Sequence, residues 1–174
     1  CSSLTQISIP SSVTYFGNNV FNECSSLTQI SILTLLTSIP LRTFYKCPSL
    51  KQISIPPSVK CIDEFAFYNC SSLEEIIIHS SINKIGNNAF NKCKSLKKIS
   101  IMSSIKTIEP YTFSECSSLT EISIPNSVEI IGEFAFYNCS SLEEIIINSS
   151  INKIENNAFN KCKSLKRISI MSFI

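Results

Sequence analysis

Cysteine is the residue type in this sequence with the clearest capacity for chemistry. Thiols at defined spacings form disulfides or hold metal ions. Structural zinc sites have cysteines with two to four residues between them, and no pair of cysteines here has that spacing. The sequence therefore predicts no metal site. Eight of the nine cysteines instead recur every 23 residues: Cys1, Cys24, Cys47, Cys70, Cys93, Cys116, Cys139 and Cys162.

Other side chains used in catalysis are scarce. The chain has one histidine, His79, and one aspartate, Asp63. His79 has no serine or cysteine partner that the sequence identifies, and the three glycines form no phosphate-binding loop. We therefore expect a protein that is not an enzyme and uses no cofactor.

Charge and hydropathy exclude two classes of partner. The net charge is +2, and the 15 lysines and arginines are interleaved with glutamates along the chain. Nucleic-acid binding calls for a basic stripe with stacking aromatic residues, which this pattern lacks. No run approaches the roughly 18 consecutive apolar residues that span a bilayer. We expect no binding to nucleic acid and no insertion into a membrane.

The cysteine spacing belongs to a repeat that fills the chain. Leucines from Leu4 to Leu165 and phenylalanines from Phe21 to Phe159 recur in the same 23-residue register. Residues 64–102 match 133–171 except at three positions, which indicates duplication of a three-repeat block. Periods of this length are typical of solenoids. We expect a single solenoid over 1–174, with seven repeats plus the first strand of an eighth, and a longer parent protein.

Each repeat predicts two short strands and a turn. The motif Leu-x-x-Ile-x-Ile alternates with period two, so its isoleucines point into the core. A second apolar pair, such as Val59 with Ile62, predicts a shorter extended piece. Asn-Asn-x-Phe-x-x-Cys predicts a turn or a short helix. The expected fold is a leucine-rich-repeat solenoid, with a parallel sheet on one face and short second strands and helical turns on the other.

This repeat changes the interpretation of the cysteines. Neighbouring cysteines of the register would lie one rung apart, within disulfide range, but with parallel side chains. A column of buried free thiols, packed as small hydrophobic groups, is favoured over disulfides. Cys61 lies outside the register. We expect it to be exposed and to be the most reactive thiol.

The pattern resembles a known repeat family. Residues 116–139, CSSLTEISIPNSVEIIGEFAFYNC, are similar to the repeat of the BspA-like leucine-rich repeat family, and the resemblance covers the whole chain. It implies a curved solenoid with a strand-lined face and no catalytic residues. It also implies a cell-surface or secreted protein, of bacteria or anaerobic protists, that acts in adhesion and binds host proteins. Some intracellular leucine-rich-repeat proteins are instead scaffolds or phosphatase regulators, which is the alternative.

The outward positions of the main strand form the predicted binding face. Glu74 and Glu75 should meet Lys97 and Lys98 on the next rung, and the alternative is that such pairs only stabilise the sheet. Apolar side chains stand where serine or proline is commoner, at Leu33, Ile77, Met102, Ile146 and Met171. They indicate either a contact surface or drift of the repeat. The predicted binding residues are these: Gln52, Glu75, Ile77, Lys97, Lys98, Met102, Glu121, Glu144, Ile146 and Arg167.

Two further features bear on association. Aromatic residues gather around the turn, where they either cover it or form an anchor patch: Phe65, Tyr68, Tyr111, Phe134 and Tyr137. The first and last strands are open edges, through which two copies can pair. Sedimentation across a range of concentrations tests that pairing, and a strict monomer contradicts it. The expected function is a protein-binding repeat module at the cell surface, with an intracellular scaffold as the alternative.

Overall fold

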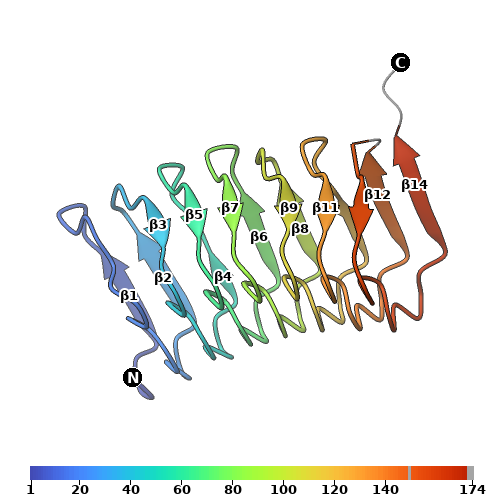
Figure 1. Ribbon diagram of the computed structural model, residues 1–174. Helices are drawn as coiled ribbons and strands as arrows, with labels where there is room; N and C mark the ends of the chain where they lie inside the picture. Colours follow the sequence, from blue (N-terminus) through green and yellow to red (C-terminus); the bar gives the residue numbers. More distant parts are fainter. Residues whose placement is uncertain (149, 172–174) are drawn as a thin grey trace.

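The chain winds into a solenoid in which each 23-residue repeat forms one coil (Figure 1). The computed structural model describes residues 1–148 and 150–171, and the side chains of Asn148, Ile170 and Met171 lie outside that description. Three elements repeat along the solenoid, namely a main strand, a short second strand and a turn. Each element stacks on its counterpart in the neighbouring coils, because residues 23 apart occupy equivalent positions.

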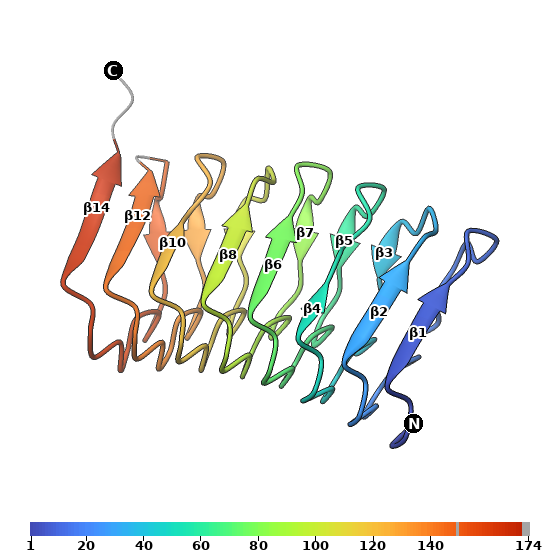
Figure 2. The same ribbon diagram turned by 180° about the vertical axis from the view of Figure 1, so that it is seen from behind.

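The main strands form one long face of the solenoid, seen from the front in Figure 2. They pair in parallel and in strict register, for example Ile7 with Ile30. The strands alternate between inward and outward residues, as in β6, where Ile76 and Ile78 are buried while Glu75 and Ile77 are exposed. The strands are β1 (Gln6–Ile9), β2 (Gln29–Ile32), β4 (Gln52–Ile53), β6 (Glu75–Ile78), β8 (Lys98–Ile101), β10 (Glu121–Ser123), β12 (Glu144–Asn148) and β14 (Arg167–Met171).

Short second strands lie behind the main strands, as the second apolar pair of each repeat predicted. They form two parallel three-stranded ladders, β3-β5-β7 and β9-β11-β13. In the first coil, residues 13–16 do not form such a strand. The bounds are β3 (Ser38–Ile39), β5 (Cys61–Ile62), β7 (Lys84–Ile85), β9 (Thr107–Ile108), β11 (Ile130–Ile131) and β13 (Lys153–Ile154).

The prediction of helical turns is wrong, because none of the turns in the described residues is helical. Each turn holds two residues with left-handed backbone, four apart, such as Asn88 (φ 59°) and Lys92 (φ 64°). A right-handed helix cannot continue through such residues. Backbone N–H groups of the turn donate instead to the next coil, as Phe67 N does to Ala89 O at 2.8 Å. The turns therefore form a third ladder, the turn stack, made of residues 18–23, 41–46, 64–69, 87–92, 110–115, 133–138 and 156–161.

A column of phenylalanines runs through the core beside the turn stack. Consecutive rings, from Phe21 to Phe159, lie 5.2–5.7 Å apart with planes within 19° of parallel. The register cysteines pack next to this column, and those from Cys24 to Cys139 are buried. From Cys47 onward, each register thiol donates to the carbonyl of a phenylalanine 26 residues earlier, as Cys93 Sγ does to Phe67 O at 3.2 Å. The predicted column of buried free thiols is confirmed.

Two glycines allow close approach between neighbouring coils. A Cβ atom on Gly132 would lie 2.8 Å from both Ile108 O and Pro110 N, which are backbone atoms of the preceding coil. Gly132→Ala is therefore expected to lower the free energy of unfolding by about 1–3 kcal/mol, as overpacking does. Urea denaturation of the purified chain measures this change.

Gly17→Ala supplies the matched control for Gly132→Ala. The nearest heavy atom to a Cβ at Gly17 is Val20 Cγ2, at an ordinary 3.9 Å, and no glycine has positive φ. The added methyl group should leave stability unchanged or raise it by about 0.4–1 kcal/mol, by restricting the unfolded chain. Equal losses in the two variants would contradict this account of the coil contacts.

Candidate functional site

The main-strand face carries the candidate site, at a break in its ladder. The main strands form two hydrogen-bonded sheets, β1-β2-β4-β6-β8 and β10-β12-β14, although β8 and β10 lie side by side (Figure 2). Met102 N donates to Ile78 O at 2.9 Å and so extends the ladder beyond β8. The position equivalent to Met102 in the next coil is Pro125. Proline has no backbone N–H to donate, so this coil cannot extend its ladder in the same way.

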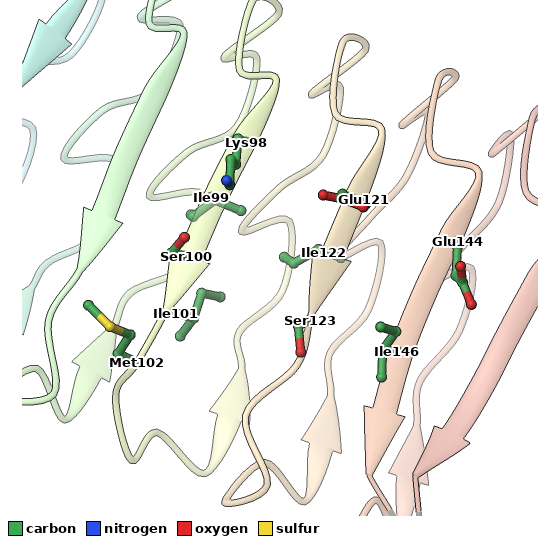
Figure 3. A pocket seen from close by; sticks show the side chains of 10 residues that line it. All are labelled: Lys98, Ile99, Ser100, Ile101, Met102, Glu121, Ile122, Ser123, Glu144 and Ile146. Atoms are coloured by element: carbon green, nitrogen blue, oxygen red, sulfur yellow. The ribbon is translucent and has the colours of Figure 1, made fainter.

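A groove of about 330 Å³ lies at this break. Its apolar side chains include Met102, which is 58% exposed, and the half-buried Ile146. Figure 3 shows these two on either side of Ser123, with the three charged residues along the other end of the groove. The lining residues are Lys98, Ile99, Ser100, Ile101, Met102, Glu121, Ile122, Ser123, Glu144 and Ile146. Five of the ten predicted binding residues are thus brought together here.

Two charges of the groove, Lys98 and Glu121, lack the cross-strand partners that other charges of the strand face have. Lys97 binds Glu74 on the preceding rung at 3.0 Å, as the sequence predicted. Lys98 and Glu121 are also one rung apart, but they straddle the break, and neither belongs to an ion pair in the described part of the chain. Both charges therefore remain available to a ligand in the groove.

Glu144 is the third charged residue of the groove and is held in place. Arg167 Nη1 lies 3.7 Å from Glu144 Oε1, and the Ser169 hydroxyl donates to the same oxygen at 2.7 Å. The neighbouring Glu143 forms a cross-strand pair of the same kind, with Lys166 at 3.1 Å. Arg167 thus supports the groove without lining it.

The remaining predicted residues lie along the same face, outside the groove. Gln52, Glu75 and Ile77 line a shallower hollow of about 270 Å³ between β4 and β6, together with His79. Glu75 faces Lys98 in register, but the two form no ion pair among the described residues. Lys97 is engaged with Glu74 outside both hollows. Two further hollows lie on the same face, one of about 380 Å³ lined by Gln29 and Leu33 and one of about 220 Å³ lined by Gln6. The predicted residues are therefore divided among separate hollows rather than gathered in one continuous site.

Sequence reasoning missed the break itself and the serines that line it, Ser100 and Ser123. A signal for it was present, since prolines follow the main strands of three coils at Pro10, Pro56 and Pro125. The two interior coils of this kind have short main strands, with two residues in β4 and three in β10. Proline at the strand end therefore accompanies a short main strand, but β4 still pairs with β2 and β6, so the ladder of the described main strands is interrupted only at the coil of Pro125.

Cys61 differs from its prediction. The side chain is half-buried and its thiol donates to Asp63 Oδ1 at 3.0 Å. Desolvation, followed by the hydrogen bond to Asp63, raises the pKa of the Cys61 thiol to about 12. A thiol must ionise to act as a nucleophile, so Cys61 is not the reactive cysteine that its place outside the register indicated. The pKa of Cys162 is lowered instead, by a hydrogen bond with Cys139.

Two observations concern metal and membrane contact. Within residues 1–148 and 150–171, no three histidine, cysteine, aspartate or glutamate side chains are grouped so that they could hold a metal ion. The same residues contain no helix of the length and hydropathy needed to cross a membrane.

The stacked coils, strand-lined face and inward leucines define a leucine-rich-repeat solenoid with parallel strands. The sequence profile described as the BspA type leucine rich repeat region matches residues 1–117 and 83–174, in six copies. The chain belongs to the BspA-type leucine-rich repeat family. The curated proteins contain no significant match to its sequence.

Three solved bacterial structures share this fold. A leucine-rich cell surface protein of Faecalibacterium prausnitzii is 27% identical over 98% of this chain, with a TM-score of 0.68. A leucine-rich repeat protein of Bacteroides ovatus is 29% identical over 99% of the chain, with a TM-score of 0.73. The pneumococcal vaccine antigen PcpA, 22% identical over 98% of the chain and with a TM-score of 0.69, shares the fold. The chain spans 60%, 56% and 46% of these three proteins, respectively.

Proposed function

We propose that the chain is a protein-binding module of a cell-surface protein, active in adhesion or ligand recognition and not in catalysis. The observation that carries this proposal is the groove between β8 and β10, where exposed Met102 lies near the available charges of Lys98 and Glu121. The cell-surface relative from Faecalibacterium prausnitzii supports the location. Family membership supports binding, because leucine-rich repeats present extended surfaces to partners.

The occupant that we propose for the groove is an extended segment of a partner protein. The groove's volume of about 330 Å³ is at the lower end of the range for ligand pockets. A groove of this size holds one or two side chains. An apolar side chain seated on Met102 and Ile146 would supply the buried centre of the contact. A basic and an acidic side chain on either side would complement Glu121 and Lys98 and fix the direction of the segment.

Substitution at the groove tests this proposal against a matched position. Met102→Asp and Ile146→Asp are expected to weaken binding to individually purified extracellular matrix proteins at least tenfold, or about 1.4 kcal/mol. Leu33 occupies the position of Met102 three coils earlier and is 65% exposed. Leu33→Asp should leave the affinity unchanged. Undiminished binding by both groove variants, or no binding by the unmodified chain to any protein of the panel, overturns the proposal.

An intracellular scaffold is the second candidate function, and one observation favours it. All nine cysteines are free, as is usual in reducing compartments. Labelling of intact cells with a membrane-impermeant reagent distinguishes the two candidates. A labelled protein supports the surface module, whereas a protein protected until lysis supports the scaffold.

A further inference from the structure

A second cavity, of about 470 Å³, lies on the turn stack rather than on the strand face. Aromatic side chains from the second and third turns form one wall, and those from the fifth and sixth turns form the other. The fourth turn lies between them. We call this cavity the aromatic notch, and its lining residues are Tyr45, Phe65, Tyr68, Asn88, Asn91, Lys92, Tyr111, Ser114, Glu115, Phe134 and Tyr137.

Each wall of the notch is a stack of rings. Tyr45 and Tyr68 stack at 4.9 Å, with Phe65 edge-on to Tyr68 at 5.7 Å. Tyr111 and Phe134 stack at 5.0 Å on the other side. Because Phe134 follows Tyr111, this stack leaves the fourth-turn side of Tyr111 open to the notch, whereas Lys92 Nζ lies 5.5 Å from the centroid of the Tyr68 ring.

Backbone conformation does not account for the aromatic residues in the walls of the notch. Phe65, Tyr111 and Phe134 adopt left-handed backbone, with φ between 54° and 59°. Asparagine fills the same position in other turns, at Asn88 and Asn157, and tolerates this conformation more easily than an aromatic residue does. The aromatic residues therefore cost conformational free energy at these positions, and their side chains are the feature that distinguishes them.

The floor of the notch is polar and electrically balanced. Asn91 is buried and its Nδ2 donates to Asn88 Oδ1 at 2.8 Å, but Asn91 Oδ1 has no hydrogen-bond partner among the described residues. Lys92 Nζ lies 3.9 Å from Glu115 Oε1. Asn91 Oδ1 is closed to solvent, whereas the side chains of Lys92 and Glu115 are 36% and 32% exposed and can form hydrogen bonds with ligand hydroxyl groups.

The width of the notch fits one six-membered ring. Phe65 and Tyr111 are two turns apart in the same register, which places them roughly 10 Å apart at the usual rung spacing of about 4.8 Å. A ring in van der Waals contact on both faces needs roughly 7–8 Å, at about 3.5–4.0 Å per contact. The cavity volume is within the range of small-molecule sites.

From these features we propose that the aromatic notch binds a neutral sugar, as a pyranose unit of an oligosaccharide. A pyranose offers C–H faces to the aromatic walls and hydroxyl groups to the floor, where Asn91, Lys92 and Glu115 supply donors and acceptors. The pairing of Lys92 with Glu115 leaves the floor without net charge, which favours a neutral ligand.

Two other ligand chemistries fit less well. An apolar or aromatic side chain would cover the part-exposed Lys92 and Glu115 without offering them hydrogen bonds, which is unfavourable. A quaternary ammonium ion would compete with Lys92, whose Nζ already lies 5.5 Å from the centroid of the Tyr68 ring. The sugar is the ligand class that satisfies both the walls and the floor.

Tyrosine fluorescence provides a direct assay of this proposal. The chain has no tryptophan, and four of its five tyrosines line the notch. Titration with maltotriose, cellotriose, chitotriose and lactose should give a saturable change with at least one sugar. Tyr68→Ala, Tyr111→Ala and Asn91→Ala should each weaken that binding at least tenfold. Tyr15→Ala, in the first coil and 74% exposed in the native chain, should not.

The seventh turn provides an internal control for the floor. Asn160 Nδ2 donates to Asn157 Oδ1 at 2.9 Å, as Asn91 does to Asn88. This second pair follows the wall of Phe134 and Tyr137, but the described residues contain no further aromatic turn beyond it. Asn160→Ala should therefore bind the sugar like the unmodified chain.

Three results overturn the sugar proposal. The first is the absence of a saturable change with every sugar up to roughly 10 mM, well beyond the millimolar affinities of weak ligands. The second is equal weakening by Asn91→Ala and Asn160→Ala in variants whose melting temperatures match that of the unmodified chain. The third is saturable binding of a tyrosine-rich peptide where no sugar binds. Because the strand face is not involved, Met102→Asp should leave sugar binding intact, which separates this test from that of the groove.

Discussion

Replacement of Phe90 by alanine is expected to lower the free energy of unfolding by about 3–5 kcal/mol, the usual cost of removing a fully buried phenylalanine ring. Phe90 is completely buried and stacks on Phe67 at 5.3 Å and on Phe113 at 5.7 Å. Both stacks are lost in the variant and a cavity is left in the middle of the array. In a solenoid, coils are stabilised mainly by their neighbours, so this loss is felt on both sides. Urea denaturation followed by circular dichroism measures it.

Phe159→Ala is the matched control for Phe90→Ala. Phe159 stacks on one described ring, Phe136, at 5.5 Å and is only partly buried. Its loss should cost clearly less than that of Phe90, because fewer contacts disappear and water already reaches the site. Equal destabilisation by the two substitutions would show that the ring column does not act as a stack.

Stability is expected to fall steeply above pH 9 because of the thiol column. Burial raises the pKa of Cys47 from 9.0 to about 12, and it raises the pKa of Cys70, Cys93 and Cys116 well above the ordinary value. The folded chain thus keeps these protons at a pH where the unfolded chain loses them. Their contribution is complete below about pH 9 and is lost as the pH rises toward the folded-state pKa values.

Cysteine ionisation is expected to cause a large loss of stability at high pH. At pH 10, one unit above the unfolded pKa, each thiol contributes a loss of about 1.4 kcal/mol, or roughly 5–6 kcal/mol for the four. Urea denaturation at pH 8 and at pH 10 measures the difference. Tyrosine and lysine also titrate in this range, so the comparison is made with a Cys70→Ala, Cys93→Ala variant, which should lose less stability over the same interval. An identical pH dependence in both chains excludes the thiols as its cause.

The sequence predicted the repeating parts of the structure well, because a register of 23 residues constrains every coil in the same way. The inward isoleucines, the phenylalanine column and the buried cysteines all follow from that register. The turns were predicted less well. The motif Asn-Asn-x-Phe-x-x-Cys is compatible with a helix as an isolated segment. The stacked neighbour changes the outcome, since it accepts the backbone hydrogen bonds that a helix would have used internally.

The candidate site was predicted only in part, because it depends on departures from the repeat. Residues on the outward lines, such as Met102 and Ile146, were identified correctly as neighbours on one face. Their assembly into a groove required the break between β8 and β10, which the register alone does not indicate. The aromatic notch also depends on a departure from the repeat. It forms where Asn88 and Asn91 replace aromatic residues in one turn.

A partner protein that binds the strand face should contact the groove between β8 and β10. Photo-crosslinking tests this contact most directly, with a photoreactive phenylalanine analogue placed at Met102 or, in a separate chain, at Leu33. Both positions are exposed and occupy the same place in their coils. With a matrix protein that binds the unmodified chain, we predict crosslinks from position 102 and few from position 33. Crosslinks from position 33 alone, or equally from both, would contradict the claim.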